Sequence, residues 1–150
     1  MRVALFEPEI AGNVGAVLRL GACFGTAVDL IEPMGFAWDD RRVRRAAMDY
    51  IDHVEIARHA GFDAFRGAAG NRRLVLFTTK ASQSLYDFTF APDDILLFGK
   101  ESAGVPAAVA DACPARVCIP INPAVRSMNV ATSAAIALSE ALRQTGGFPR

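Results

Sequence analysis

The chain has 150 residues, which suits one domain (residues 1–150) with a single substantial core, and 52% of the residues are hydrophobic, as in soluble globular proteins. The formal net charge is zero, which excludes the overall basic field that marks many nucleic-acid-binding domains. RNA binding would therefore need a local basic patch, or a patch completed by a second subunit.

The N-terminus and the cysteines indicate a reduced cytoplasmic compartment. Glu7 and Glu9 interrupt the first apolar run, so no signal peptide is expected, and no apolar segment is long enough to span a bilayer. Cys23, Cys113 and Cys118 are odd in number and lack the paired spacing of zinc or redox sites. We therefore expect a cytoplasmic protein with no membrane span and no metal.

The first elements alternate between strand and helix. Residues 3–6 form a short apolar run that suits a buried parallel strand, and a turn with Gly12, Asn13 and Gly15 leads into a helix over residues 14–24 that Gly25 ends. Residues 28–31 predict a second strand. This order favours an α/β domain with a mostly parallel sheet. The turn GNVGAV lacks the GxGxxG spacing of dinucleotide-binding folds.

An arginine-rich block follows the second strand. It reads as a loop entering a helix capped by Asp39 or Asp40, and it carries Trp38, Arg41, Arg42, Arg44 and Arg45. The charges could hold phosphates and the indole could stack on a splayed base. The alternative is a solvated helix face whose arginines pair with nearby aspartates. His53 and His59, six residues apart, suit structural or surface roles better than metal binding.

Three further strands are predicted in the second half of the chain, over residues 74–78, 95–98 and 117–121, with a short helix over residues 107–113. A loop follows each strand, and the loop after Phe98 contains Gly99, Glu101 and Gly104. Ligands of open α/β sheets bind outside the carboxyl ends of the strands, so these loops form the expected pocket.

The last stretch contains the prolines Pro120 and Pro123, then Ser127 or Asn129 as a helix cap, then about fourteen residues of good helix former that end at Gly146. A strand, a polar loop and a helix N-terminus together favour a ligand cradle, because the free backbone N–H groups seek an acceptor. An amphipathic helix with an ordinary cap is the other interpretation.

Three blocks of the sequence resemble the motifs of the SPOUT (trefoil-knot) RNA 2′-O-ribose methyltransferases. They are Asn13-Val14-Gly15 with Arg19, then Phe98 to Pro106, then Ile119 to Val130. Their order and spacing match over nearly the whole chain. EPEIAGNVG and EPMGFAWDDRRVRRAAMDY resemble more closely the small single-domain subfamily that methylates the wobble ribose of tRNA.

The resemblance implies an α/β domain with a deep C-terminal trefoil knot, in which S-adenosylmethionine (SAM) binds within the knot. Carried over position by position, the expected cofactor contacts are Phe77, Thr78, Gly99, Glu101, Ile119, Ser127 and Met128. The same three loops were reached from the strand pattern alone.

The resemblance also places the catalytic arginine at Arg19, with Asn13, Ser127 and Asn129 at polar motif positions. An arginine with a pKa above about 12 is a poor base. We therefore expect Arg19 to orient the nucleotide phosphate and stabilise the developing alkoxide, while the proton acceptor stays open. The alternatives are a surface arginine at position 19 and plain capping or loop bonding by the polar residues.

Relatives of this kind are homodimers whose active site draws on both subunits. A small-residue face on the last helix (Ala131, Ala134, Ala135, Ala137 and Ala141) fits either close dimer packing or the core of one chain. Ser139 stands where the family often has tyrosine, which puts a tyrosine-dependent contact in doubt. With no room for an RNA-binding extension, recognition is expected to fall to the arginine-rich block.

These features together predict a SAM-dependent, metal-independent, homodimeric 2′-O-methyltransferase acting on the wobble nucleotide of tRNA. Two alternatives remain at this point: methylation of another tRNA or ribosomal RNA ribose, and a catalytically silent knot protein that binds RNA or adenosyl ligands.

Overall fold

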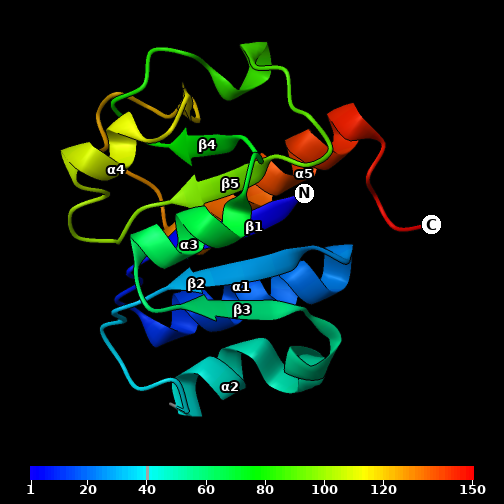
Figure 1. Cartoon of the computed structure of the whole chain (residues 1–150). Coiled ribbons are helices and arrows are strands. Elements are labelled where there is room, and N and C mark those ends of the chain that lie inside the picture. The colour runs from blue at the N-terminus through cyan, green and yellow to red at the C-terminus, as the bar shows by residue number, and fades with distance from the viewer. Residues whose placement is uncertain (40) are drawn as a thin grey trace.

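The computed structural model describes residues 1–39 and 41–150, and its centre is a six-stranded sheet in which every pairing is parallel (Figure 1). In spatial order the strands are β3 (Ile56–His59), β2 (Ala27–Ile31), β1 (Arg2–Phe6), β5 (Ile95–Phe98), β4 (Leu74–Phe77) and β6 (Ala115–Val117). The chain builds outward from β1 to β3 on one side and then fills the other side, so the strand order reverses between β1 and β5. Ligands of open parallel sheets bind at such a switch point.

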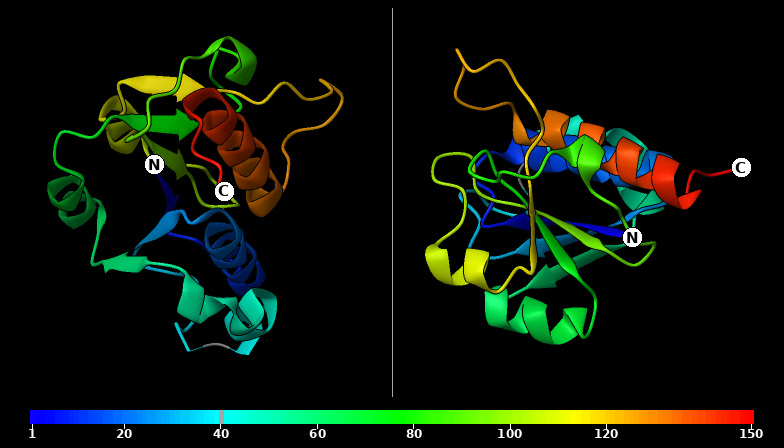
Figure 2. Two further views of the ribbon diagram at one scale, coloured as in Figure 1. Left: turned by 90° about the vertical axis from the view of Figure 1, so that its right-hand side faces the viewer. Right: turned by 90° about the horizontal axis from the view of Figure 1, so that it is seen from above.

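Helices cover both faces of the sheet (Figure 2). Residues of α1 (Ala11–Phe24), α2 (Arg41–Ala47) and α5 (Val130–Thr145) join the core cluster on one face. Residues of α3 (Phe62–Ala69) and α4 (Ala107–Asp111) join the cluster on the other face. Two 3-10 helices, η1 (Met48–His53) and η2 (Leu85–Asp87), complete the described elements.

Alternation along the central strands explains the two clusters. In β1, Val3 and Leu5 point toward α1 and α5, whereas Ala4 and Phe6 point toward α3. Every residue of β4 and β5 is buried, which is why these strands read as unbroken apolar runs in the sequence. The predicted α/β class with a parallel sheet is confirmed.

Several predicted boundaries differ from the structure. The strand predicted over residues 74–78 ends at Phe77, and the helix predicted over residues 107–113 ends at Asp111. Helix α1 begins at Ala11, so Gly12 and Asn13 lie inside its first turn rather than in a preceding turn. The last strand is Ala115–Val117 and not residues 117–121. The strand ends early because Cys118 leaves β4: its N–H donates to the Gln83 carbonyl (2.8 Å) and its carbonyl accepts from the Leu85 N–H (2.8 Å).

Both predicted ends of the last helix are confirmed at Asn129 and Gly146. The Asn129 side chain accepts hydrogen bonds from the N–H groups of Ala131 (2.9 Å) and Thr132 (3.1 Å), and Gly146 ends α5 with a φ of 64°. Ser127 is not the cap and lies in the exposed loop before the helix.

Helix α5 uses its small residues within its own subunit. Ala134, Ala137 and Ala141 are fully buried against the sheet and α1, so for these three the core interpretation holds and the dimer interpretation was wrong. Ala131 also packs against this core.

His59, at the end of β3, has a structural role. Its Nε2 lies 2.8 Å from a carboxylate oxygen of buried Asp29, which also binds Arg2 through a 2.6 Å contact. His53 is exposed at the end of η1. The predicted structural and surface roles of the two histidines are confirmed.

Candidate functional site

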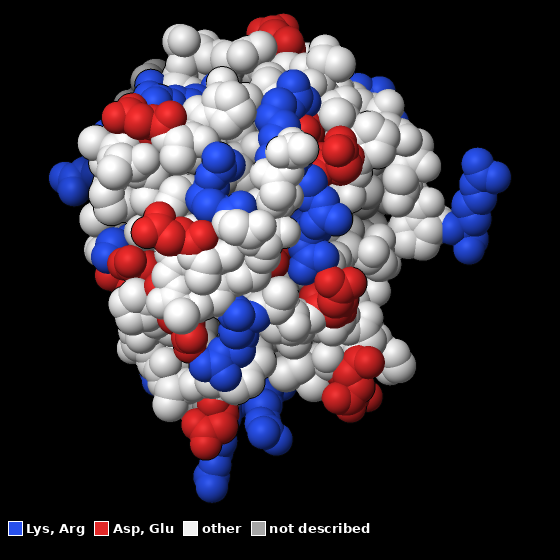
Figure 3. Space-filling view, viewed as in Figure 1, with Lys and Arg blue, Asp and Glu red and all other residues white. Residues whose placement is uncertain are grey.

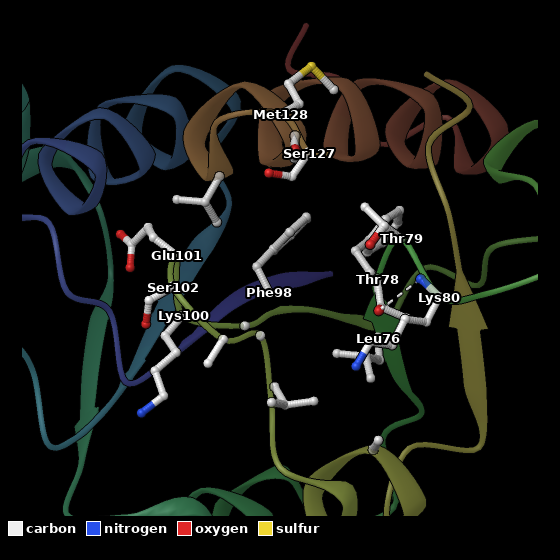
Figure 4. A pocket seen from close by; sticks show the side chains of 18 of the residues that line it. Leu76, Thr78, Thr79, Lys80, Phe98, Lys100, Glu101, Ser102, Ser127 and Met128 are labelled. Atoms are coloured by element: carbon white, nitrogen blue, oxygen red, sulfur yellow. Dashed lines mark hydrogen bonds between the residues drawn. The ribbon is translucent and has the colours of Figure 1, made fainter. Parts of the chain in front are cut away.

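A cavity of about 890 Å3 opens at the carboxyl ends of β4 and β5, beside the start of α1 and the loop before α5 (Figure 4). That volume lies within the range of small-molecule and cofactor sites. Residues from every expected cofactor loop line this cavity: Phe77, Thr78, Gly99, Glu101, Ile119, Ser127 and Met128, together with Asn13 and Asn129. The tertiary structure thus brings together three loops that lie up to fifty residues apart in the chain.

The lining combines an apolar centre with polar margins. The Phe98 ring points into the cavity and stacks on Phe77 with a centroid separation of 4.9 Å, while Leu76 and Ile119 supply further apolar surface (Figure 4). Thr78, Thr79, Lys80 and Ser127 contribute polar groups around this centre. Such a lining suits a flat heteroaromatic ring that carries polar substituents.

Gly99 is required by the loop that contains it. A Cβ at Gly99 would lie 2.5 Å from the backbone carbon of Gly104, which no real side chain tolerates. The close approach arises because Lys100 and Gly104 exchange two backbone hydrogen bonds of 3.0 and 2.9 Å. The absence of a side chain at Gly99 therefore lets the loop close upon itself.

A chain of side-chain hydrogen bonds links the three sequence motifs. The Asn129 Nδ2 donates to the Asn13 Oδ1 (2.9 Å), and the Asn13 Nδ2 donates to a Glu101 carboxylate oxygen (3.1 Å). The same carboxylate accepts from the backbone N–H groups of Glu9 (2.8 Å) and Ile10 (3.3 Å) at the start of α1. We call Glu101, Asn13 and Asn129 the polar clamp, because together they join the loop after β5 to α1 and α5.

Two acidic residues that were expected only to interrupt the first apolar run also hold the loop after β5. Glu7 accepts a hydrogen bond from the Lys100 Nζ (2.9 Å), and Glu9 accepts from both the backbone N–H (2.8 Å) and the Oγ (2.7 Å) of Ser102. Glu7 sits at a φ of 43°, which is uncommon for a side chain of its size. The sequence feature that could have identified these two residues is their position directly after a strand.

These contacts shift two pKa values. The Ser102 hydrogen bonds lower the pKa of Glu9, and the Glu7 hydrogen bond raises the pKa of Lys100. Glu9 and Lys100 therefore stay charged at neutral pH. An ion pair and a charge-assisted hydrogen bond hold the loop after β5. Both are stronger than a hydrogen bond between neutral groups.

Arg19 does not line this cavity. It lies on the exposed side of α1, six residues and about 9 Å along the helix axis from Asn13. Its guanidinium carbon lies 5.2 Å from the centroid of the Tyr50 ring on η1.

The arginine-rich block forms α2 at the far end of the sheet, beyond β3 and α1 (Figure 1). Arg41, Arg42, Arg44 and Arg45 are exposed there, and basic side chains project from this end of the molecule among acidic ones (Figure 3). Asp40, one of the two caps that we considered, lies outside the described residues. Trp38 is half-buried, and the Arg58 guanidinium lies 5.2 Å from its ring centroid, so part of the indole surface is already covered.

Within residues 1–39 and 41–150, no group of His, Cys, Asp and Glu side chains has the arrangement of a metal site. Over those same residues, none of the helices combines the length and the hydrophobicity that crossing a bilayer requires.

A doubly covered parallel sheet with a ligand-sized cavity beyond its strand ends defines an α/β ligand-binding domain. Comparison with known proteins identifies the family. Residues 1–139 match the SpoU rRNA Methylase family, and the chain belongs to this family.

Relatives and solved structures of similar length agree with this assignment. A Beijerinckia indica protein named tRNA (cytidine(34)-2'-O)-methyltransferase is 55% identical over 99% of this chain and 94% of its own length. An Escherichia coli K12 protein of the same name is 41% identical over 97% of this chain and 94% of its own. A structure from work on the 2-OH methylation of C/U34 on tRNA superposes with a TM-score of 0.92 and 38% identity, covering 95% of this chain and 94% of that one.

The family also includes longer proteins with a bound cofactor. An AdoMet-bound rRNA methyltransferase from Sinorhizobium meliloti superposes with a TM-score of 0.86 and 27% identity, over 95% of this chain and 55% of that one.

Proposed function

We propose that this protein is a SAM-dependent 2′-O-methyltransferase that modifies the wobble ribose in the tRNA anticodon loop. The observation that carries the proposal is the cavity at the strand ends, lined by the three family motifs, in a fold shared with proteins of that name. We further propose that residues 1–150 act as one cytoplasmic catalytic domain.

The cavity fits the cofactor. Phe98, Leu76 and Ile119 offer apolar surface for an adenine ring. Residues 99–105, together with Ile121, Ser127 and Met128, also line the cavity. Thr78 and Ser127 can donate or accept hydrogen bonds to ribose hydroxyls or to the amino acid moiety. Glu101 already accepts three hydrogen bonds from the protein, so its role is to shape the loop that holds the cofactor.

When bound, SAM would supply the methyl group: the carbon–sulfur bond would break as the ribose 2′-oxygen bonds to the carbon, with release of S-adenosylhomocysteine and of the 2′-hydroxyl proton. The cavity residues hold the donor in place, and such positioning lowers the barrier of an in-line displacement. The Arg19 guanidinium stabilises negative charge on the 2′-oxygen while it orients the neighbouring phosphate. Ser127 and Asn129 lie at the rim of the cavity and position the loop that faces the ribose.

Because Arg19 lies outside its own cavity, we propose a homodimer in which each subunit contributes Arg19 to the cavity of the other. The two-fold symmetry of such a dimer builds two equivalent composite sites. Exposed apolar side chains near α1 and η1, Ile10 (50%) and Met48 (48%), are available for contact with a second subunit.

We propose that the tRNA backbone binds along α2 through Arg41, Arg42, Arg44 and Arg45, with Trp38 beside them. Replacing these four arginines by glutamine should weaken tRNA binding and its salt dependence while SAM binding is unchanged. Unchanged tRNA affinity in a filter-binding titration would refute this surface.

We also propose that the C-terminal segment is knotted beneath the loop of residues 78–94. That loop is bonded to the chain on both sides of the crossing: to Cys118 through Gln83 and Leu85, and to α5 through Gln144. A crystal structure tests this proposal. If the traced backbone becomes a straight line when its two ends are drawn apart, the chain is not knotted.

Mass spectrometry of tRNA nucleosides, after incubation with purified protein and isotopically labelled SAM, tests the function. We expect one labelled 2′-O-methylnucleoside, mapped to the wobble position by fragmentation of the anticodon loop. Label at another tRNA position or only in ribosomal RNA would move the activity to a different ribose. Tight SAM binding in calorimetry without any transfer would indicate a silent knot protein.

A further inference from the structure

Tyr50 places an aromatic ring against Arg19, the residue on which the proposed chemistry depends. The Arg19 Cζ lies 5.2 Å from the ring centroid, within the range of cation–π attraction. We propose that Tyr50 is a positioning residue that holds the Arg19 guanidinium in the orientation used for methyl transfer. The inference rests on the proposed function, and it adds a residue outside the three sequence motifs.

The backbone fixes the ring in this place. Helix α2 packs closely on α1 at Gly15, where a Cβ would lie 2.5 Å from the Val43 carbonyl oxygen and from the Ala46 Cβ. The chain then leaves α2 through Met48, whose φ of 55° begins η1 and turns it along α1. Ile51 packs against the core and anchors η1 beside α1.

A contact with the Tyr50 ring matters for Arg19 because Arg19 is an exposed residue on a helix surface. A long charged side chain in that setting samples many rotamers, and each chemical step must wait for the productive one. A cation–π contact at an exposed site changes such a population by about two- to fivefold. The contact is therefore large enough to alter turnover and too small to alter the fold.

Tyr50 is 36% exposed, so its ring surface is also open to a nucleic acid base. Base stacking would lower the affinity for tRNA when the ring is removed, whereas positioning of Arg19 would lower the turnover of bound substrate. The two roles can be distinguished kinetically, because stacking would change KM for tRNA and positioning would change kcat.

Steady-state kinetics of Tyr50→Ala and Tyr50→Phe test the inference. We expect Tyr50→Ala to lower kcat about two- to fivefold with KM for SAM and tRNA unchanged, and Tyr50→Phe, which keeps the ring, to recover the loss. Tyr86→Ala, at an exposed tyrosine (63%) that does not line the cavity, is the matched control.

Three outcomes overturn the inference: equal losses in Tyr50→Phe and Tyr50→Ala, a change confined to KM for tRNA, or full turnover of Tyr50→Ala while Arg19→Ala is inactive. The last leaves the proposed function intact. Full turnover of Arg19→Ala instead removes the proposed role of Arg19 and this inference with it.

A second measurement needs no activity. In an NMR spectrum of the free protein, the Arg19 Nε–H signal, assigned by its loss in Arg19→Ala, should carry a ring-current shift that disappears in Tyr50→Ala and persists in Tyr50→Phe. A chemical shift that is the same in the wild type, Tyr50→Ala and Tyr50→Phe would show that the ring does not hold the guanidinium.

Discussion

At the scale of single residues, Asn13 occupies the centre of the candidate site. It is 9% exposed and bonds to Glu101 on one side and to Asn129 on the other. Sequence reasoning gave Asn13, Asn129 and Glu101 separate roles in catalysis or cofactor binding. The polar clamp gives them a common one, because it fixes the relative positions of three elements that border the cavity.

Asn13→Ala should therefore loosen the cavity. The substitution leaves one Glu101 oxygen and the Asn129 amide without this partner, and we expect a loss of about 1–3 kcal/mol in the free energy of unfolding. SAM affinity, measured by calorimetry, should fall with it. Asn71→Ala, at an exposed turn, is the matched control, and equal behaviour of the two variants would contradict the clamp.

At the scale of elements, helix α5 joins the core to the loop of residues 78–94. Its buried alanines pack on the sheet and α1, while near its end Gln144 donates to the Phe88 carbonyl (2.9 Å) and accepts from the Phe90 N–H (3.0 Å). Phe88 and Phe90 pack into the core beside this bond pair. The last turn of α5 thus fastens the loop from outside the cavity.

Gln144→Ala should release that loop. Two part-buried backbone groups lose their partner, so we expect a cost of about 1–3 kcal/mol and faster amide hydrogen exchange across residues 85–90. Ser139→Ala, at an exposed position of the same helix, should change neither quantity. Unaltered exchange in Gln144→Ala would show that the core alone holds the loop.

Glu140 adds a pH dependence to this end of α5. Hydrogen bonds from Arg143 and Gln144 lower the pKa of Glu140 from 4.5 to about 2. Its contribution to stability is therefore complete above pH 4.5 and is lost as the pH falls toward 2. Because Arg143 is largely exposed, we expect no more than about 1 kcal/mol.

Urea unfolding of the wild type and Glu140→Gln at several pH values measures this contribution. The wild type should be the more stable of the two at pH 6, and the difference should shrink steadily as the pH falls from 4.5 toward 2. A difference that stays constant over this range would mean that the carboxylate charge contributes nothing.

At the scale of the whole molecule, the sheet order sets what one subunit can do. The reversal between β1 and β5 gathers the loop after β5, the start of α1 and the loop before α5 around one cavity. The same arrangement leaves Arg19 on the outer side of α1. In the proposed homodimer, one subunit therefore supplies the cavity and the other supplies the arginine at each composite site.

Mixing two inactive variants tests the composite site. A heterodimer of Arg19→Ala and Gly99→Ala pairs one intact cavity with the Arg19 of the other subunit. Random exchange should therefore restore about a quarter of the wild-type activity. Each variant alone should be inactive, the second because a Cβ at Gly99 collides with Gly104. Heterodimers that form without regaining activity would show that both groups act within one subunit.

The sequence by itself determined the local structure. Apolar runs of four or five residues between loops predicted β1, β4 and β5, and Asn129 and Gly146 predicted the ends of α5. The resemblance to the family motifs supplied nine residues that line the cavity. These features depend on neighbours in the chain, which is why periodicity, caps and motifs predict them.

Only the tertiary structure decided the rest. The strand order, the Glu7 and Glu9 braces, the bonds of Gln144 to the loop and the placement of Arg19 beside Tyr50 and away from its own cavity all join residues distant in sequence. No local pattern encodes such contacts, because a side chain's partner is set by which elements pack together. These contacts form because helices and loops pack against both faces of the sheet.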